Sequence, residues 1–156
     1  VCLAIPLYKQ LHLLKKYGAA VFASIGSGVA ASVVSIFLMC RLMGLSHVNY
    51  VTLLPKSITT AIGMGVSEEA GGIVTLTVMS IILTGVIGNV LGELVFRITG
   101  VRHPIARGLA LGTSAHAIGT AKALELGEIE GAMSSLSIAV AGLMTVIAVP
   151  IAANLI

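Results

Sequence analysis

The chain has 156 residues, of which 57% are apolar and only 10% are charged, and its mean hydropathy is +1.08. Soluble domains carry about 25% charged residues, so too few charges are present to cover a water-facing surface, and the high apolar content excludes intrinsic disorder. A net charge of only +3, few aromatic residues and two cysteines exclude a nucleic-acid-binding protein and a disulfide scaffold, which leaves a protein embedded in a lipid bilayer.

The N-terminal residues VCLAIPLY resemble the end of an apolar helix, and the basic residues Lys9, Lys15 and Lys16 follow them. Because the chain has no initiator methionine and no visible signal peptide, we expect it to lack the N-terminal helices of a longer protein. Residues 17–40 carry no charge. Crossing about 30 Å of hydrocarbon takes roughly 20 helical residues, so a membrane-spanning helix is predicted over about residues 17–42.

The next apolar stretch, residues 50–67, contains Pro55 and Lys56 near its middle. Proline interrupts helical hydrogen bonding, and backbone that leaves helical geometry inside a bilayer is tolerated only where it is buried in protein or lines a water-filled cavity. A broken or re-entrant segment is therefore predicted here. The uncharged residues 70–92 that follow are long enough to span, and a second spanning helix is predicted over about residues 70–96.

A second interrupted stretch lies between Arg107 and Lys122 and reads GLALGTSAHAIGTA over residues 108–121. At about 1.5 Å per residue it is too short to span unaided, so a broken or re-entrant segment is predicted over about residues 108–124, with Gly112 as the helix breaker. Residues 131–156 carry no charge and predict a third spanning helix. Together these elements predict an all-α, polytopic membrane protein with a single domain over residues 1–156.

The two halves of the chain resemble each other. Ala61–Gly63 and Ala117–Gly119 have the same sequence, and in both halves a short polar segment precedes an acidic, glycine-containing turn and a long apolar helix. If both short segments return to the face they left, the basic clusters at residues 9–16 and 97–107 both lie on the cytoplasmic side. The halves then run in opposite directions, which predicts an inverted repeat like that of secondary transporters. If each short segment spans instead, the arginines lie outside.

The interrupted segments are the predicted binding site. A helix that begins inside the membrane presents unpaired backbone N–H groups and the positive end of its dipole, which favour an anion such as a carboxylate. Lysine, histidine and hydroxyl side chains near the breaks add charge and hydrogen-bond donors, so a small, cationic, hydroxyl-rich cradle for a short monocarboxylate is predicted. Its residues are Lys56, Ser57, Thr59 and Thr60 from the first segment, and Thr113, His116 and Thr120 from the second.

Each of these residues also has a purely structural interpretation. Lys56 can extend its charged end to the membrane interface, His116 can be a buried histidine with satisfied hydrogen bonds, and hydroxyls in membrane helices often bond to the preceding turn or to a neighbouring helix. No second His or Cys stands at ligand spacing from His116, so we expect no metal and no cofactor. The chain contains no Asp and no HExxH, P-loop or GxSxG motif, so we do not expect an enzyme.

Two strings in these segments, LPKSITTAIGM (54–64) and PIARGLALGTSAHAIGTAKALELGEIEGAMSSL (104–136), resemble the LrgB/CidB family of bacterial membrane proteins. The same domain forms the C-terminal half of the plant plastidal glycolate/glycerate translocator, and the resemblance extends over nearly all of the chain. Ala61 stands where many members have proline, and residues 113–116 read TSAH where TASH is common. The resemblance implies that the family's motif positions are occupied here by Lys56, Ser57, Thr59, Thr60, Thr113, His116, Gly119 and Thr120.

This resemblance implies a multi-pass protein of the bacterial inner or plasma membrane. Family members are described as antiholin-like modulators of murein hydrolase activity and cell lysis, paired with a small LrgA/CidA-type membrane partner, and others are implicated in transport of glycolate, glycerate or pyruvate. We therefore expect a transporter, or the carrier subunit of one, for small monocarboxylates, because a pore needs no lysine and histidine at broken helices. The alternative is an antiholin-like homo-oligomer that regulates a pore and needs no solute site.

Overall fold

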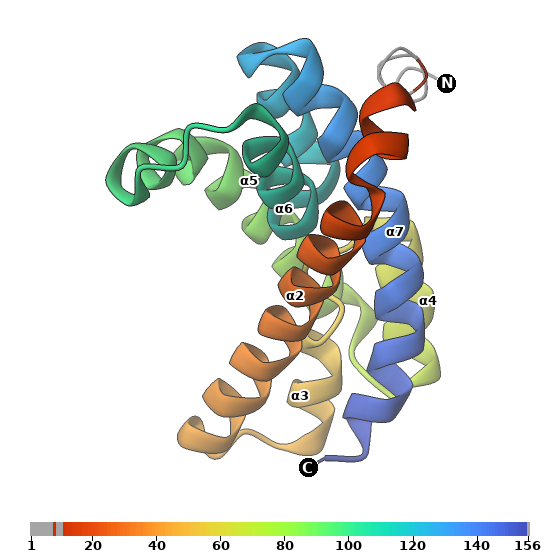
Figure 1. Ribbon diagram of the computed structural model, residues 1–156. Helices are drawn as coiled ribbons and strands as arrows, with labels where there is room; N and C mark the ends of the chain where they lie inside the picture. The colour runs from red at the N-terminus through yellow and green to blue at the C-terminus, as the bar shows by residue number, and fades with distance from the viewer. Residues whose placement is uncertain (1–7, 9–10, 156) are drawn as a thin grey trace.

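The computed structural model describes residue 8 and residues 11–155 of the chain. All regular secondary structure in that part of the chain is helical, as Figure 1 shows, which confirms the predicted all-α architecture. Lys9 lies outside the described residues, as do the side chains of Lys15 and Lys16, so the membrane orientation stays a prediction. The helices are α2 (Leu11–Met43), α3 (His47–Leu53), α4 (Thr60–Glu69), α5 (Val74–Thr99), α6 (Pro104–Leu126) and α7 (Glu128–Ala153).

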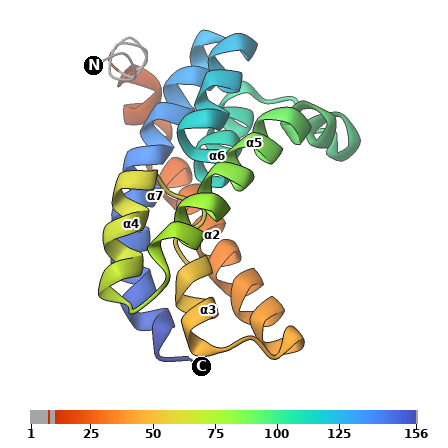
Figure 2. The ribbon, with the colours of Figure 1, turned by 180° about the vertical axis from the view of Figure 1, so that it is seen from behind.

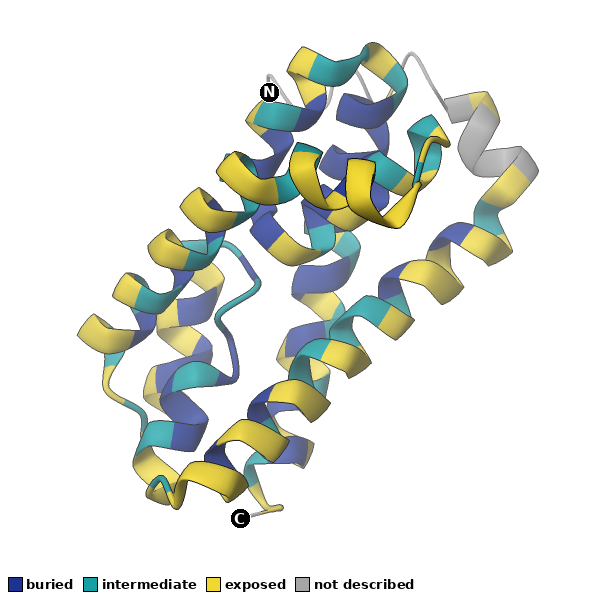
Figure 3. Ribbon diagram, turned by 90° about the vertical axis from the view of Figure 1, so that its left-hand side faces the viewer, coloured by how far each residue is buried: buried dark blue, intermediate teal, exposed yellow. Residues whose placement is uncertain are grey.

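Within the part of the chain that the structure describes, three helices are long and apolar enough to cross a bilayer. Figure 3 shows exposed residues along the outer sides of the long helices, and many of these are large apolar side chains, which suit lipid better than water. The chain is therefore a multi-pass membrane protein, and each uncharged run of the sequence overlaps one of the spans. The spans are Tyr17–Met43, Val74–Thr99 and Glu128–Ala153.

The first interrupted segment is a helical hairpin formed by α3 and α4. Pro55 lies in the turn between them, where its missing N–H costs no helical hydrogen bond. Thr52 of α3 and Ser67 of α4 meet at the same turn of α5, because the Thr77 hydroxyl donates to the Thr52 carbonyl at 2.9 Å and its oxygen lies 2.6 Å from the Ser67 hydroxyl. Residues on both sides of the turn thus meet at α5, so the chain reverses within this segment, which confirms the predicted break.

The second interrupted segment is α6, which is broken at His116. This residue has φ 43° and ψ −133°, and no other non-glycine residue in the described ranges has a positive φ, so the prediction that Gly112 breaks the helix is wrong. Gly112 lies within the first half, where it makes room for α7: a Cβ there would lie 2.9 Å from the Ser134 Cα. Thr120, in the second half, also reaches Ser134, with the hydroxyl oxygens 2.7 Å apart. The chain therefore doubles back at His116 (Figure 1).

The long helix that follows the first hairpin, α5, and the one that follows the second, α7, run in opposite directions. α5 begins beside Thr52, and its far half reaches Lys122 of α6, whose Nζ lies 3.6 Å from the Glu93 carboxylate. α7 begins beside α6 and ends beside α3, where the Tyr50 hydroxyl donates to the Ala152 carbonyl at 2.9 Å. Figure 2 shows α4 lying along α7. The inverted repeat itself stays a prediction.

Close helix packing at the centre depends on glycine. A Cβ at Gly85 of α5 would lie 2.8 Å from the Cε1 atom of His116, and one at Gly28 of α2 would lie 3.3 Å from the Thr113 hydroxyl oxygen. Because these side chains are missing, α2 and α5 both approach α6 directly, as small residues commonly allow in membrane proteins. The broken helix is therefore enclosed by two of the three spanning helices.

Candidate functional site

An open groove of about 580 Å³ lies between α2, the turn joining α3 and α4, α5 and the first half of α6. Four separate parts of the chain therefore form its walls, and both interrupted segments contribute. Small residues leave the space open, and hydroxyl groups and one amine face it. The lining residues are Gly28, Ala31, Ser32, Ser35, Lys56, Ser57, Thr84, Ile87, Gly88, Thr113 and Ser114.

Lys56 supplies the positive charge of this groove. Its half-buried side chain donates from Nζ to the Ser57 hydroxyl at 3.0 Å and to the Ser32 hydroxyl of α2 at 3.5 Å, and these two hydroxyl oxygens are 3.3 Å apart. None of the carboxylates in the described part of the chain pairs with Lys56. Because an ammonium has three N–H donors, one remains for a ligand, and the charge of the groove is not neutralised from within.

The other hydroxyl groups of the groove differ in what they can offer to a ligand. Those of Thr113 and Ser114 donate to carbonyl groups one turn earlier in α6, at 2.7 and 2.6 Å, so they offer only lone pairs to the groove. The Thr84 hydroxyl of α5 makes no hydrogen bond to another described residue and is able to donate. An anion needs donors, and these come from the lysine, its neighbouring serines and Thr84.

His116 and Thr120 lie behind the groove, in the packed interior. The His116 side chain belongs to a residue only 3% exposed, and its Nε2 lies 2.9 Å from the Ile81 carbonyl oxygen, so Nε2 carries the hydrogen and donates. Thr120 is fully buried and donates to the His116 carbonyl at 3.0 Å. Asn89 of α5 donates to the Ile118 carbonyl, also at 3.0 Å. Side chains thus satisfy polar groups of the broken backbone.

Thr59 and Thr60 lie at the start of α4, outside the lining of the groove. Thr59 is the N-cap residue of that helix, but its side chain makes no capping hydrogen bond, and both threonines are half-buried. Of the predicted site residues, the structure therefore brings Lys56, Ser57 and Thr113 together in one groove. It places the other four at the start of α4 or in the interior around the α6 break.

Besides Ser114 of α6, three polar residues of the groove are absent from the predicted site: Ser32, Ser35 and Thr84. They lie in α2 and α5, whose sequences read as plain spanning helices. Their only signal is a hydroxyl inside an uncharged apolar run, and such hydroxyls commonly bond within their own helix. Ser35 makes a bond of that kind, to the Ser32 carbonyl at 2.8 Å. Ser32 meets Lys56 because of how α2 is rotated about its axis, and the sequence of α2 does not reveal that rotation.

A chain of ion pairs fixes the second half of α6 to α5 outside the groove. The Lys122 Nζ lies 3.1 Å from the Glu125 carboxylate and 3.6 Å from that of Glu93, which also pairs with Arg97 at 2.8 Å. The hydrogen bond to Glu125 raises the pKa of Lys122 above its usual value. Surface pairs of this kind contribute little to stability. Within the described ranges, no three His, Cys, Asp or Glu side chains lie where they could hold a metal ion.

Comparison with known proteins matches this chain to one family. The model of the LrgB-like family matches residues 1–155. The chain belongs to the LrgB-like family. Among its relatives, holin-like protein CidB of Staphylococcus epidermidis (strain ATCC 35984) is 44% identical over 151 residues, and antiholin-like protein LrgB of Bacillus cereus (strain B4264) is 42% identical over 150 residues.

The LrgB-like chain is covered over 97% and 96% of its length by these two relatives, but it spans only 66% and 65% of theirs, just under two thirds. No solved structure gives a significant match. The family resemblance drawn from the two sequence strings is confirmed. Those strings contain Lys56, Ser57 and Thr113, so the LrgB-like signature borders the groove from two sides.

Proposed function

We propose that this LrgB-like chain binds a small monocarboxylate beside Lys56 and carries it across a bacterial inner or plasma membrane, alone or as a carrier subunit. Glycolate, glycerate and pyruvate are the candidate solutes. The Lys56 ammonium supports this most, because it is half-buried, held by two serine hydroxyls and without a carboxylate partner among the described residues. A cation at membrane depth costs about 2.5 to 3.5 kcal/mol, and a bound carboxylate would offset that cost.

In the proposed complex, the solute carboxylate accepts a charge-assisted hydrogen bond from Lys56, while Ser32 and Ser57 keep the ammonium in place. A hydrogen bond to a charged group contributes about 1.5 to 3 kcal/mol. Thr84, on the α5 wall, is available to the hydroxyl or keto oxygen of the solute. The groove, of about 580 Å³, has space for a body of a few carbon atoms. Binding and release need no covalent step, so the proposed role is not catalytic.

Uptake by proteoliposomes tests this proposal. The full-length chain, reconstituted with an LrgA/CidA-type partner, should take up labelled glycolate or pyruvate until uptake saturates. Lys56→Met should reduce that uptake by about 10-fold or more, because one charge-assisted hydrogen bond is lost. Arg102→Met removes one exposed charge outside the groove and should leave uptake unchanged. Saturable uptake that is the same in Lys56→Met as in the wild type would refute the proposal.

A second candidate function is antiholin-like regulation of lysis, in which a homo-oligomer or a complex with an LrgA/CidA-type partner controls a pore. The names of the relatives, holin-like and antiholin-like, favour it. So does a row of exposed apolar side chains along one face of α5, which another membrane helix can cover. Uptake that never saturates, with leakage of large solutes, would support this function. The row consists of Leu83, Ile87, Val90, Leu94 and Ile98.

A further inference from the structure

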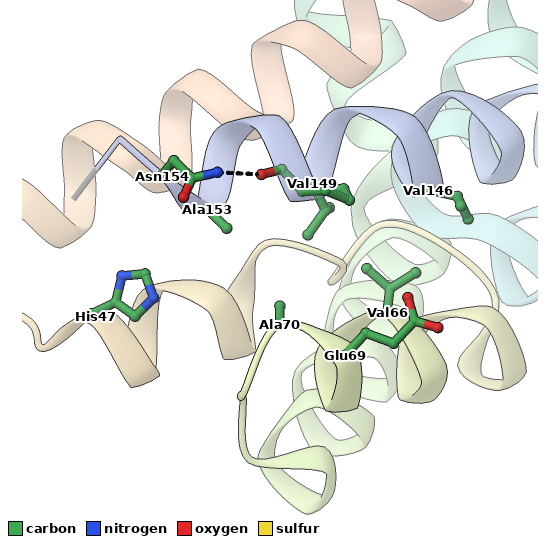
Figure 4. A pocket seen from close by; sticks show the side chains of 9 residues that line it. His47, Val66, Glu69, Ala70, Val146, Val149, Ala153 and Asn154 are labelled. Atoms are coloured by element: carbon green, nitrogen blue, oxygen red, sulfur yellow. Dashed lines mark hydrogen bonds between the residues drawn. The ribbon is translucent and has the colours of Figure 1, made fainter.

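A second cavity, of about 370 Å³, lies where α3 begins and where α4 and α7 end (Figure 4). It shares no lining residue with the groove beside Lys56. Its polar side chains are those of His47, Glu69 and Asn154, and the rest of its wall is apolar. The apolar lining residues are Val66, Ala70, Val146, Val149, Pro150 and Ala153.

The polar atoms of this cavity are mainly hydrogen-bond acceptors. Pro150 has no backbone N–H, so the carbonyl of Val146, four residues earlier in α7, lacks its usual helical donor. Asn154 donates through Nδ2 to the Pro150 carbonyl at 2.9 Å, which leaves its amide oxygen free to accept. An ionised Glu69 carboxylate can only accept. A ligand beside Glu69 and Val146 must therefore supply hydrogen-bond donors, because His47 and Asn154, which also have N–H groups, lie toward the other side of the cavity (Figure 4).

The local charge favours a cation. α4 ends at Glu69 and α7 ends at Ala153, so two helix C-termini, the negative ends of their dipoles, lie at one cavity. Glu69 adds a full negative charge and forms no ion pair with another described residue. In Figure 4 its carboxylate and the His47 ring lie on separate sides of the cavity, with Ala70 between them. The imidazole therefore leaves space beside the carboxylate.

We propose that this cavity binds a primary ammonium group, with Glu69 as the counter-ion and the carbonyl oxygen of Val146 as a second acceptor. A primary ammonium carries one positive charge and three N–H donors, and the apolar wall suits the short carbon chain attached to it. Two sources share this chemistry: the head group of phosphatidylethanolamine, because the cavity lies at helix ends, and a free small amine. The site is separate from the groove, so it does not depend on the proposed transport function.

Lipid binding to the full-length chain tests this proposal. Native mass spectrometry of the purified protein should show tighter binding of phosphatidylethanolamine than of phosphatidylcholine, whose quaternary ammonium has no N–H donor. Glu69→Gln should weaken phosphatidylethanolamine binding by about 10-fold or more, because one charge-assisted hydrogen bond is lost. Glu68→Gln changes the preceding exposed residue, which does not line the cavity, and as the matched control it should leave the affinity unchanged.

Ethanolamine, measured by calorimetry, distinguishes the two sources. If the protein binds ethanolamine and Glu69→Gln abolishes that binding, the site belongs to free amines. If the protein binds phosphatidylethanolamine but not ethanolamine, and Glu69→Gln weakens the lipid binding, the site belongs to the lipid head group. The proposal is overturned if Glu69→Gln folds and binds both probes as well as Glu68→Gln does. It is also overturned if the wild-type protein binds neither probe. If Glu69→Gln does not fold, Ala70→Leu fills the cavity instead, and unchanged binding in that variant overturns it.

Discussion

Thr77→Val tests how the α3–α4 hairpin is held on α5. The Thr77 hydroxyl donates to the Thr52 carbonyl at 2.9 Å and accepts from the Ser67 hydroxyl at 2.6 Å. Valine has nearly the same shape as threonine but no hydroxyl. The Thr77 hydroxyl also lies 3.3 Å from the Ile73 carbonyl in its own helix. The substitution therefore removes the hydroxyl's hydrogen bonds without opening a cavity, and a change in stability reports chiefly on the two shorter ones, to Thr52 and Ser67.

The expected magnitude follows from burial. A hydrogen bond contributes about 0.5 to 1.5 kcal/mol in proteins generally, and bonds between membrane helices average about 0.6 kcal/mol. Thr77 and Ser67 are both fully buried, so water cannot replace the lost partner, and an unsatisfied buried group costs about 1 to 3 kcal/mol. We expect Thr77→Val to lower the free energy of unfolding by about 1 to 3 kcal/mol.

Equilibrium unfolding in mixed micelles, titrated with SDS, measures this free energy. Thr75→Val makes the same chemical change at an exposed position two residues earlier in α5, and it should alter the stability by less than about 0.5 kcal/mol. If the two variants are equally stable, the hydroxyl does not hold the hairpin, and the reasoning from these contacts is refuted.

Three further substitutions address other contacts. Tyr50→Phe removes the hydroxyl that donates to the Ala152 carbonyl at 2.9 Å, and the free energy of unfolding should fall by about 1 kcal/mol in the same micelles. Gly85→Ala places a methyl group 2.8 Å from the His116 ring, and this overpacking should lower it by about 1 to 3 kcal/mol. Ser32→Ala leaves the groove lysine with one hydroxyl partner and should raise the glycolate concentration for half-maximal uptake by about 3- to 10-fold in proteoliposomes.

Each of these three variants has a matched control. Tyr8→Phe removes an exposed hydroxyl, Gly65→Ala adds a methyl group where nothing lies within 4 Å, and Ser27→Ala removes an exposed hydroxyl from α2. A variant whose measured value equals that of its control contradicts the contact on which it was designed.

Both interrupted segments can be located from the sequence because their causes are local. Pro55 has no backbone N–H for a helical hydrogen bond, which favours a break, and the stretch between Arg107 and Lys122 is too short to cross a bilayer. The residue that breaks α6 cannot be found in the same way. Gly112 has a weaker helix propensity than His116. It nevertheless lies inside a continuous stretch of helix, because α7 packs so closely there that no side chain fits. The chain reverses at His116 instead.

The direction of each side chain depends on packing between distant elements, which local sequence patterns do not report. His116 points inward because Gly85 leaves room for its ring and Ile81 offers a carbonyl acceptor. Ser32 lines the groove because Gly28, one turn earlier, lets α2 lie directly against α6. The sequence thus predicts the kinds of groups in the site, a lysine and hydroxyls, while helix packing decides which of them share one groove.

The hydrogen bond between Tyr50 and Ala152 joins positions 102 residues apart. During synthesis on the ribosome, α3 and α4 emerge long before α7, and chains generally fold from the N-terminus onward. The first hairpin must therefore wait for the last helix before this contact can close. Until α7 is in place the Tyr50 hydroxyl has no Ala152 carbonyl to donate to, so the packing of the first hairpin is completed only at the end of folding.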